Sequence, residues 1–292
     1  MRDFVLKIDK PISDELNYGS LKLFTPKFVT KHNEYGNMNN YGIVKSVPKN
    51  YKEGNVDIGD TIYVHHNVVI NKENNQNAED IQTNNYCIDA EENEYAVPYC
   101  EEGANNMAYF VVKQNGEKHV IGDVILTIAN DNNNREEEYN GIHLMKGRSD
   151  IIESEVAFLN DKMRSLGVEE GDIIGSMANS DYEFDVDGVK YWRMFNTYVH
   201  YVIKDGEKKM INDWLLVETE PDEKEMGSGF MISERLQTVN PKATILSAGN
   251  DCEFDEGDKI HLVSINKLAP QTPEHDNRLF ITREFNIAFK YL

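Results

Sequence analysis

The chain has 292 residues and a formal net charge of -21, a balance that disfavours binding to nucleic acid or to anionic membrane surfaces. Its hydrophobic content of 40% is enough for one large core or for several small ones, which excludes a wholly disordered chain. No stretch approaches the ~20 apolar residues of a transmembrane helix, and the three cysteines lack CxxC spacing, so we expect a protein of the reducing cytoplasm.

Short runs of β-branched and aromatic residues, each bounded by turn-forming residues, follow one another along the chain. This composition is typical of strands that pack one face on a core. The clearest predicted strands are Tyr41–Val47, Thr61–Val64, Tyr109–Lys113, Tyr198–Lys204 and Ala243–Ser247. We therefore predict an all-β protein.

One long polar segment, Asn71–Asn106, interrupts this pattern. It is rich in Asn and Glu and carries Tyr86, Tyr95 and Tyr99. A loop of this length is usually functional or disordered, and its aromatic residues favour a contact surface. We interpret the segment as an insertion.

A second segment, Asp150–Gly167, has apolar residues at helical spacing. Asp150 and Glu153 are placed as a capping box, and Gly167 as a stop. The register of the repeats described next instead favours a strand near Val156, with a helical turn after it.

Two sequence markers occur three times in the same order, which indicates three tandem copies of one unit. The first is an aspartate that leads into an apolar strand, at Asp3–Leu6, Asp123–Leu126 and Asp213–Leu216. The second is a Gly-Asp turn preceded by an apolar and an acidic residue, at Val56–Ile62, Val168–Ile174 and Phe254–Ile260. A matched succession of three is hard to obtain by chance.

A third marker closes the first two copies. Val111–Lys118 and Val202–Lys208 each contain an Asn-Gly or Asp-Gly pair between apolar runs, a strong hairpin signal because both residues accept positive φ. The third copy ends instead in Arg278–Ile281 and Phe285–Phe289, which we interpret as a pair of strands. We place the domain boundaries at residues 1–121, 122–211 and 212–292, and predict that each domain is a small β-barrel.

The repeated unit resembles the GroES family of co-chaperonins, the lids of group I chaperonins. The match is closest at Asp213–Val263, where DWLLVETE, GSGFMIS, KATILSAG and EGDKIHLV follow one another at nearly the family's spacing. The second copy matches through DVILTIA, NGIHLMKG, SEVAFLN and EEGDII, and the first more loosely through DFVLKID, YGSLKLF, YGIVKSV and IGDTIYV. The resemblance implies three tandem GroES-like β-barrels with mobile loops.

In that family a mobile loop after the first strand carries an apolar tripeptide that docks on the apical domain of the chaperonin. By position, the resemblance assigns this role to Phe230, Met231 and Ile232 in the third copy, to Ile142, His143 and Leu144 in the second, and to Leu21 and Leu23 in the first. One such loop binds weakly, because its ordering offsets part of the roughly 1.5–3 kcal/mol per buried side chain. Several loops on one scaffold bind by avidity. The alternative is that each tripeptide packs on its own barrel.

Two features depart from the family. The long hairpin that roofs the family's dome is nearly missing, because only Asn250–Glu256 occupies its place in the third copy. Family rings also have seven subunits, whereas three barrels per chain do not divide seven. A ring of these barrels would therefore have a wide orifice and a different symmetry.

Ring closure in the family pairs the first strand of one subunit with the last strand of its neighbour. The resemblance therefore implies two free edges at the ends of this chain, and such edges invite intermolecular pairing. We expect self-association through edge strands that contain Phe4, Leu6 and Ile8 at one end and Ile287 and Phe289 at the other.

Motifs for catalysis, cofactors or metals are missing from the sequence. It contains no GxxxxGK[ST] or GxGxxG, and its eight histidines show no HExxH or paired Cys/His spacing. His65 and His66 are adjacent at the end of a strand, so we expect their rings on opposite faces, which disfavours a shared metal ion. We predict that the protein is not an enzyme and uses no cofactor.

Two functions follow from the resemblance. The first is a co-chaperonin-like ring or adaptor that docks on the apical domains of a group I chaperonin and assists protein folding. The second is a structural ring or adaptor subunit of a bacteriophage particle, with other virion proteins as partners. The missing roofs, the mismatch of three and seven, and the degenerate tip of the first copy favour the second. It would place the protein in the host cytoplasm or the virion.

Overall fold

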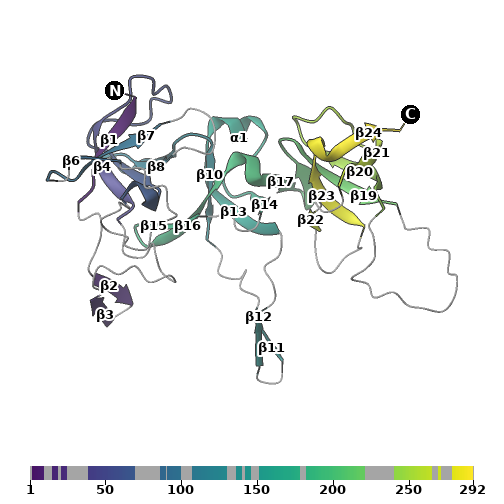
Figure 1. The fold of residues 1–292 in the computed structure, drawn as a ribbon, viewed down its shortest axis with the longest axis horizontal. Coiled ribbons are helices and arrows are strands. Elements are labelled where there is room, and N and C mark those ends of the chain that lie inside the picture. The colour runs from purple at the N-terminus through teal and green to yellow at the C-terminus, as the bar shows by residue number, and fades with distance from the viewer. Residues whose placement is uncertain are drawn as a thin grey trace. The chain divides into compact units, whose positions relative to one another are not determined.

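The computed structural model describes residues 2–9, 39–69, 86–89, 91–99, 107–129, 151–177, 182–220, 240–264 and 278–291, together with the backbone of five further short strands. Strands dominate these residues, which confirms the all-β prediction (Figure 1). The one α-helix in these ranges is α1 (Asp161–Ser165). Among the residues described, no helix has both the length and the apolar character needed to cross a membrane.

Three sheets account for most of the strands. The first contains β1 (Asp3–Lys7), β4 (Tyr41–Ser46), β5 (Thr61–Val64), β6 (Cys87–Asp89), β7 (Glu94–Pro98), β8 (Ala108–Val112) and β9 (Lys118–Val120). The second contains β10 (Val124–Ile128), β13 (Ile151–Leu159), β14 (Ile173–Met177), β15 (Tyr182–Val186), β16 (Val189–Phe195), β17 (Val199–Lys204) and β18 (Glu207–Met210). The third contains β19 (Trp214–Thr219), β20 (Lys242–Ala248), β21 (Lys259–Leu262), β22 (Ala269–Pro270), β23 (Leu279–Arg283) and β24 (Ile287–Lys290).

The three sheets share one strand order. It is β6-β7-β1-β4-β5-β8-β9 in the first, β15-β16-β10-β13-β14-β17-β18 in the second and β22-β23-β19-β20-β21-β24 in the third. The pairing of β5 with β8, of β14 with β17 and of β21 with β24 shifts register at the same place in each sheet. The internal repeat of the sequence is therefore also a repeat of topology.

The sheets are open. Among the described strands, no pairing joins the two end strands of any sheet, so the predicted closed barrels are not seen. The third sheet also differs from the other two, because β24 is its last strand within the described residues, whereas β8 and β17 each pair with a further strand.

The chain forms two compact units. Unit 1 comprises Met1–Ile125 with Phe158–Asn160, and unit 2 comprises Leu126–Ala157 with Asp161–Leu292. Unit 1 holds the first sheet, and unit 2 holds the third sheet with most of the second.

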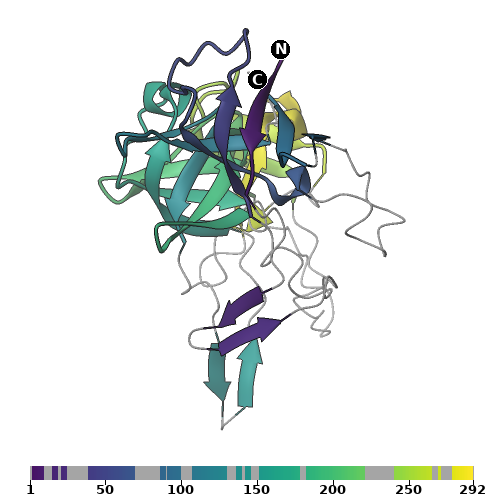
Figure 2. The same ribbon diagram turned by 90° about the vertical axis from the view of Figure 1, so that its left-hand side faces the viewer.

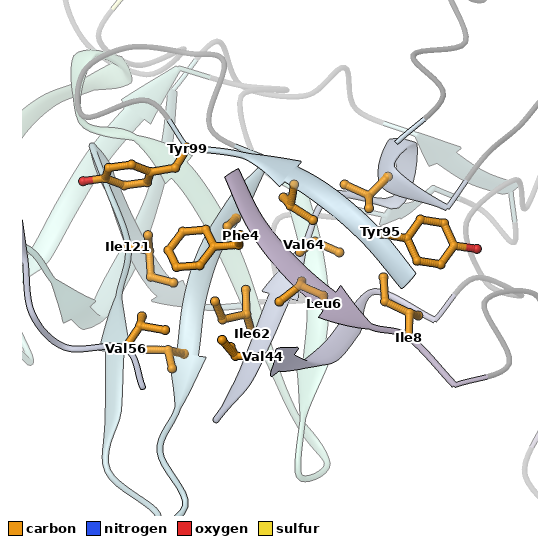
Figure 3. Packing of buried hydrophobic residues seen from close by; sticks show 14 of the residues in the cluster. Phe4, Leu6, Ile8, Val44, Val56, Ile62, Val64, Tyr95, Tyr99 and Ile121 are labelled. Atoms are coloured by element: carbon orange, nitrogen blue, oxygen red, sulfur yellow. The ribbon is translucent and has the colours of Figure 1, made fainter. Parts of the chain in front are cut away.

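The core of unit 1 is built on β1. Phe4, Leu6 and Ile8 are fully buried and pack with Val44, Ile62 and other apolar residues of the sheet (Figure 3). β1 is paired on both sides, with β4 and with β7. The predicted free edge at Phe4, Leu6 and Ile8 is therefore wrong, because hydrogen bonds to distant strands already satisfy this backbone.

Part of the predicted insertion belongs to the repeated fold. β7 lies next to β1 as β16 lies next to β10 and β23 next to β19. Tyr95 and Tyr99 are buried in the core of unit 1, so they do not form the contact surface expected for Asn71–Asn106 (Figure 3). Residues 70–85, 90 and 100–106 lie outside the described residues.

The ambiguous segment around Val156 is a strand followed by a helical turn, as the repeat register predicts. Along β13 the residues Ile152, Ser154 and Val156 are buried while Glu153 and Glu155 are exposed, a period of two. Glu153 is paired with a residue of β14, so the predicted capping box is wrong. α1 follows directly and gives way to a turn at Gly167, whose φ is +82°.

The two runs at the end of the third copy both form strands, as the sequence suggests, but the two strands do not pair with each other. β23 pairs with β19 and β22, whereas β24 pairs with β21. A 3-10 helix, η6 (Glu284–Asn286), separates β23 from β24. The long roof hairpin of the family has no counterpart among the described strands of these sheets. The links that occupy its place, residues 47–60, 160–172 and 249–258, contain no strand.

Candidate interaction surfaces

The repeated Gly-Asp turn has one geometry in all three sheets. Its glycine has positive φ, at 95° for Gly59, 91° for Gly171 and 87° for Gly257, a conformation that costs glycine no steric strain. The aspartate side chain accepts a hydrogen bond from the backbone N–H three residues earlier, in the pairs Asp60 with Asp57, Asp172 with Glu169, and Asp258 with Asp255.

A lysine at or just after the end of the neighbouring strand completes each turn. Lys113, Lys204 and Lys290 form ion pairs with Asp60, Asp172 and Asp258. The hydrogen bond that Lys204 donates to Asp172 raises the pKa of Lys204, and the hydrogen bond that Lys290 donates to Asp258 lowers the pKa of Asp258. The aspartate and the lysine of each turn are already bound to each other within their sheet. The turns therefore have a structural role and offer no free ligand site.

A long connection lies at the same topological place in each sheet, between the first strand and the second. These connections are residues 8–40, 129–150 and 220–241. Two of them contain an antiparallel hairpin that forms a sheet of its own, β2 (Glu15–Tyr18) with β3 (Leu21–Phe24), and β11 (Glu136–Tyr139) with β12 (Ile142–Met145) (Figure 2).

The predicted loop tips lie in these connections. Ile142, His143 and Leu144 belong to β12, and Leu21 and Leu23 belong to β3, with Ile142 and Leu21 in the pairs nearest the turns. Their side chains are outside the described part of the structure, as are Phe230, Met231 and Ile232. The docking role of all eight residues therefore stays a prediction.

A row of three residues crosses the outer face of each sheet. Register pairs it as Tyr41, Tyr63 and Phe110 in the first sheet, as Glu153, Gly175 and Tyr201 in the second, and as Lys242, His261 and Phe289 in the third. The third position of every row is an aromatic residue. We call it the row aromatic.

The row aromatic is covered in the first two sheets. Phe110 is 0% exposed, and its ring centroid lies 5.1 Å from that of Phe158, a residue of unit 1 at the end of β13. Tyr201 is 1% exposed and packs in one cluster with Trp214 and Ile281 of the third sheet.

One hydrogen bond and one cation also contact the Tyr201 side chain. Its hydroxyl donates to Glu153 Oε1 at 2.7 Å, and Lys208 Nζ lies 4.6 Å from the ring centroid while pairing with the same carboxylate at 3.2 Å. Gly175 makes room for the ring, since a Cβ there would lie 2.1 Å from Tyr201 Cζ. Burial is the main cause that raises the pKa of this tyrosine.

The row aromatic of the third sheet is open. Phe289 is 51% exposed. Its ring stacks on His261 at a centroid distance of 4.9 Å and meets Tyr291 at 5.2 Å, while His261 Nδ1 and the Tyr291 hydroxyl are 2.9 Å apart. Lys242 Nζ lies over the Tyr291 ring at 6.0 Å. We call Lys242, His261, Phe289 and Tyr291 the aromatic face.

The sequence marked Phe289 as an edge residue without identifying this face. The signal was present, because Tyr109-Phe110, His200-Tyr201 and Ala288-Phe289 stand at one place in three aligned copies. Ile287, the other predicted edge residue, is partly buried against the core of the third sheet.

A carboxylate in unit 1 has an unusual environment. Glu53 Oε1 accepts hydrogen bonds from the Tyr99 hydroxyl and from the Gly122 backbone N–H, both at 3.0 Å. Burial raises the pKa of Glu53, and these hydrogen bonds oppose the rise. The Tyr51, Tyr99 and Phe4 rings form edge-to-face pairs beside it. The group joins three segments of unit 1, which is a structural role.

His65 and His66 do not point to opposite faces. A 3-10 helix, η1 (His66–Val68), begins at the second histidine and breaks the strand period, so the ring centroids lie 4.0 Å apart. Within the described ranges, no group of three or more His, Cys, Asp or Glu side chains is placed to hold a metal ion.

A groove of about 760 Å³ lies in unit 2 between the β17–β18 hairpin and β20. Its charged lining is mixed, with lysines at 204, 208 and 209 and carboxylates at 205, 207 and 256. Lys204 and Lys208 are already paired with carboxylates. The groove therefore shows no preference for an anionic ligand.

Comparison with protein-family models finds no match, and a search of curated proteins finds none either.

Proposed function

We propose that this protein is a binding adaptor of the co-chaperonin type, in which three GroES-like units each present one loop to the apical domains of a group I chaperonin. The observation that carries the proposal is the long connection between the first and second strands, which recurs at one place in three sheets of equal strand order. The family resemblance places its docking tripeptide in that connection.

Three loops on one chain have a physical consequence. Each loop contributes a weak contact, but once the first loop is bound the next meets its site at an effective concentration set by the linker. The three sheets hold the loop ends at fixed positions within each sheet, which limits the ordering cost to the loop itself. A chain with a single intact loop would bind far more weakly than the whole chain.

Binding of the full chain to a purified group I chaperonin in the presence of ATP tests this function. We expect co-migration in size-exclusion chromatography, and Met231→Asp should weaken it by about tenfold or more, because one buried apolar side chain is worth roughly 1.5–3 kcal/mol. Ile58→Asp, at an exposed apolar residue outside the three connections, is the matched control. Failure of the wild-type chain to co-migrate, or equal effects of both variants, would sink the proposal.

A second candidate is a structural ring or adaptor subunit of a phage particle. The links without a strand at residues 47–60, 160–172 and 249–258 favour it, because a dome without roofs encloses little. Electron microscopy of the purified assembly separates the two functions. Seven-fold particles that contain chaperonin support the first, whereas six-fold or twelve-fold rings of this chain alone support the second.

A further inference from the structure

We propose that the groove of unit 2 is a docking site for an extended segment of a partner protein, which inserts an aromatic side chain and carries basic residues beside it. The inference rests on a comparison of two equivalent positions, one in β13 and one in β20. It goes beyond the proposed function and does not depend on chaperonin binding.

Phe158 and Ser247 hold the same position in two sheets of one topology. In β13 the backbone of Val156 exchanges two hydrogen bonds with the Gly-Asp turn that follows it, and in β20 the backbone of Ile245 does the same. Phe158 and Ser247 each stand two residues further along their strand. An aromatic ring in one sheet therefore corresponds to a small hydroxyl side chain in the other.

The two side chains have equivalent neighbours. In unit 1 the ring of Phe158 packs on Phe110, the row aromatic of the first sheet, at a centroid distance of 5.1 Å. In unit 2 Ser247 lines the groove together with Met210, which pairs with the row aromatic Tyr201. The position that carries a ring against the row aromatic in unit 1 thus lines a groove in unit 2.

The groove has the room and the apolar surface to take such a ring from outside. Its volume of about 760 Å³ is within the range of pockets that bind small ligands. In its lining, Leu166, Leu216 and Ala248 are partly buried and Leu246 is 41% exposed. An inserted phenyl ring would remove apolar surface of both partners from water, which is the main favourable term in protein association.

The unpaired charges around the groove are mainly acidic. Lys204 and Lys208 pair with Asp172 and Glu153. Within the described residues, the other charged side chains of the lining form no ion pair, and they are Asp205, Glu207, Lys209 and Glu256. Three negative charges against one positive charge favour basic residues on either side of the inserted ring.

A partner protein fits this chemistry better than a second copy of the chain does. The equivalent position in unit 1 is filled by a side chain of a polypeptide, which favours a protein segment over a small molecule. The chain itself has a net charge of -21, so two copies repel each other, whereas a basic segment is attracted. Such a segment can place its anchor residue in the groove and its charges at the rim.

An NMR titration of the methyl-labelled full chain with the capped peptide acetyl-Lys-Phe-Lys-amide tests the proposal. We expect saturable shifts in the millimolar range at the methyl groups of Leu246 and Met210, and none at Leu6 in the core of unit 1. Alanine in place of the phenylalanine of the peptide should weaken binding by about tenfold, because the ring supplies most of the buried area. Glutamate in place of both lysines should weaken it by about fivefold or more.

A variant that fills the groove tests the site itself. Ser247→Phe supplies from within the ring that Phe158 supplies in unit 1, so it should abolish the peptide-induced shifts. The matched control is Thr244→Phe, on the same strand but outside the groove, which should bind the peptide as the wild type does. Thermal unfolding verifies that both variants fold. Glu256→Lys changes only the exposed rim and should weaken binding by up to about fivefold.

Four outcomes overturn the proposal. The first is a wild-type chain without saturable shifts at Leu246, and the second is equal affinity for the phenylalanine and alanine peptides. The third is unchanged binding by Ser247→Phe or, if that variant does not fold, by Glu256→Lys. The fourth is a shift at Leu246 that grows with protein concentration when no peptide is present, because it would identify a second copy as the occupant.

Discussion

Strands β17 and β24 hold the same position in two sheets of one topology, yet their surroundings differ. In β17 the residues Val199–Val202 are buried on both faces of the sheet, whereas in β24 Ile287 is partly buried and the other three residues are exposed. The sequences follow this difference, with His200-Tyr201 in one strand and Ala288-Phe289 in the other. The strand order is thus the same in each sheet. The burial of the outer face differs, because it depends on which residues from outside the sheet pack against that face.

Truncation of the row aromatic to alanine should give the largest difference in the free energy of unfolding between β17 and β24. Tyr201→Ala removes a buried ring and leaves Glu153 without its hydroxyl donor, so we expect a loss of about 3–5 kcal/mol in the free energy of unfolding. Phe289→Ala should cost much less in the monomer, because its ring is half exposed. Urea unfolding of both variants at low protein concentration measures the contrast. Equal losses would show that outer-face burial does not distinguish the strands.

A buried histidine gives the next largest effect. The His200 ring lies 4.0 Å from the Trp214 ring, and neither of its nitrogens has a hydrogen-bond partner among the described residues. Burial, together with the charge of Arg283, lowers the pKa of His200 to about 3. The counterpart in β24 is Ala288, which does not titrate.

The sign of the pH dependence follows from the lowered pKa. Below about pH 6.5 the unfolded chain takes up a proton at His200 and the folded chain does not. The free energy of unfolding therefore decreases as the pH is lowered, by up to roughly 1.4 kcal/mol per pH unit, until about pH 3. Above pH 6.5 the group has no effect. His200→Leu should flatten this part of the profile in denaturant titrations at pH 7 and pH 4.5. An unchanged slope in the variant would contradict it.

Substitution of Gly175, which pairs with Tyr201 of β17, should reduce the free energy of unfolding by an intermediate amount. Gly175→Ala places a methyl group in the space of the Tyr201 ring, and the ring cannot shift without losing its cluster. Overpacking of this kind costs about 1–3 kcal/mol. The counterpart substitution His261→Ala removes a stacked, partly exposed ring and should cost less. Thermal unfolding compares the two, and a neutral Gly175→Ala would show that this contact is not tight.

Local signals explain what the sequence could predict. The Gly-Asp turn places its glycine, its aspartate and the N–H it binds within four residues, so all three copies were recognisable. Strand β13 was predictable because the alternation from Ile152 to Val156 competes directly with the helical pattern, and the repeat register decides between them. The eight loop-tip residues rest on resemblance alone, and no contact described here involves their side chains.

Non-local pairing explains what the sequence could not predict. Nothing near Phe4 indicates that β7 returns from ninety residues along the chain to cover the second edge of β1. The same pairing turns Tyr95 and Tyr99 from apparent loop residues into core. The first marker is also offset by one residue, because alignment of the bulges in β1 and β19 puts Asp3 at the register position of Trp214, whereas the sequence marker aligns it with Asp213. With a side-chain period of two, one residue decides which face a side chain takes.

We expect the smallest effects on stability from the lysines that pair with the Gly-Asp turns. Lys204 Nζ lies 2.6 Å from Asp172 Oδ2, and Lys290 Nζ lies 2.7 Å from Asp258 Oδ1. Lys204→Met should cost about 0.2–1 kcal/mol, because a partly exposed ion pair is screened by water and salt. Lys290→Met should cost less still, since β24 is more open.

The pKa of Asp258 is a more sensitive measure of the effect of Lys290→Met than stability is. The ammonium group of Lys290 holds the pKa of Asp258 below its ordinary value, so the stabilisation by this carboxylate is present above its unfolded pKa and is lost as pH falls through the lowered folded value. Removing the lysine should move the pKa of Asp258 upward and shift the loss to higher pH. Side-chain carboxyl NMR titration measures the shift, with Asp255 of the same turn as an internal control. A pKa that does not move would mean that the backbone N–H of Asp255, and not the lysine, sets the charge state of the turn.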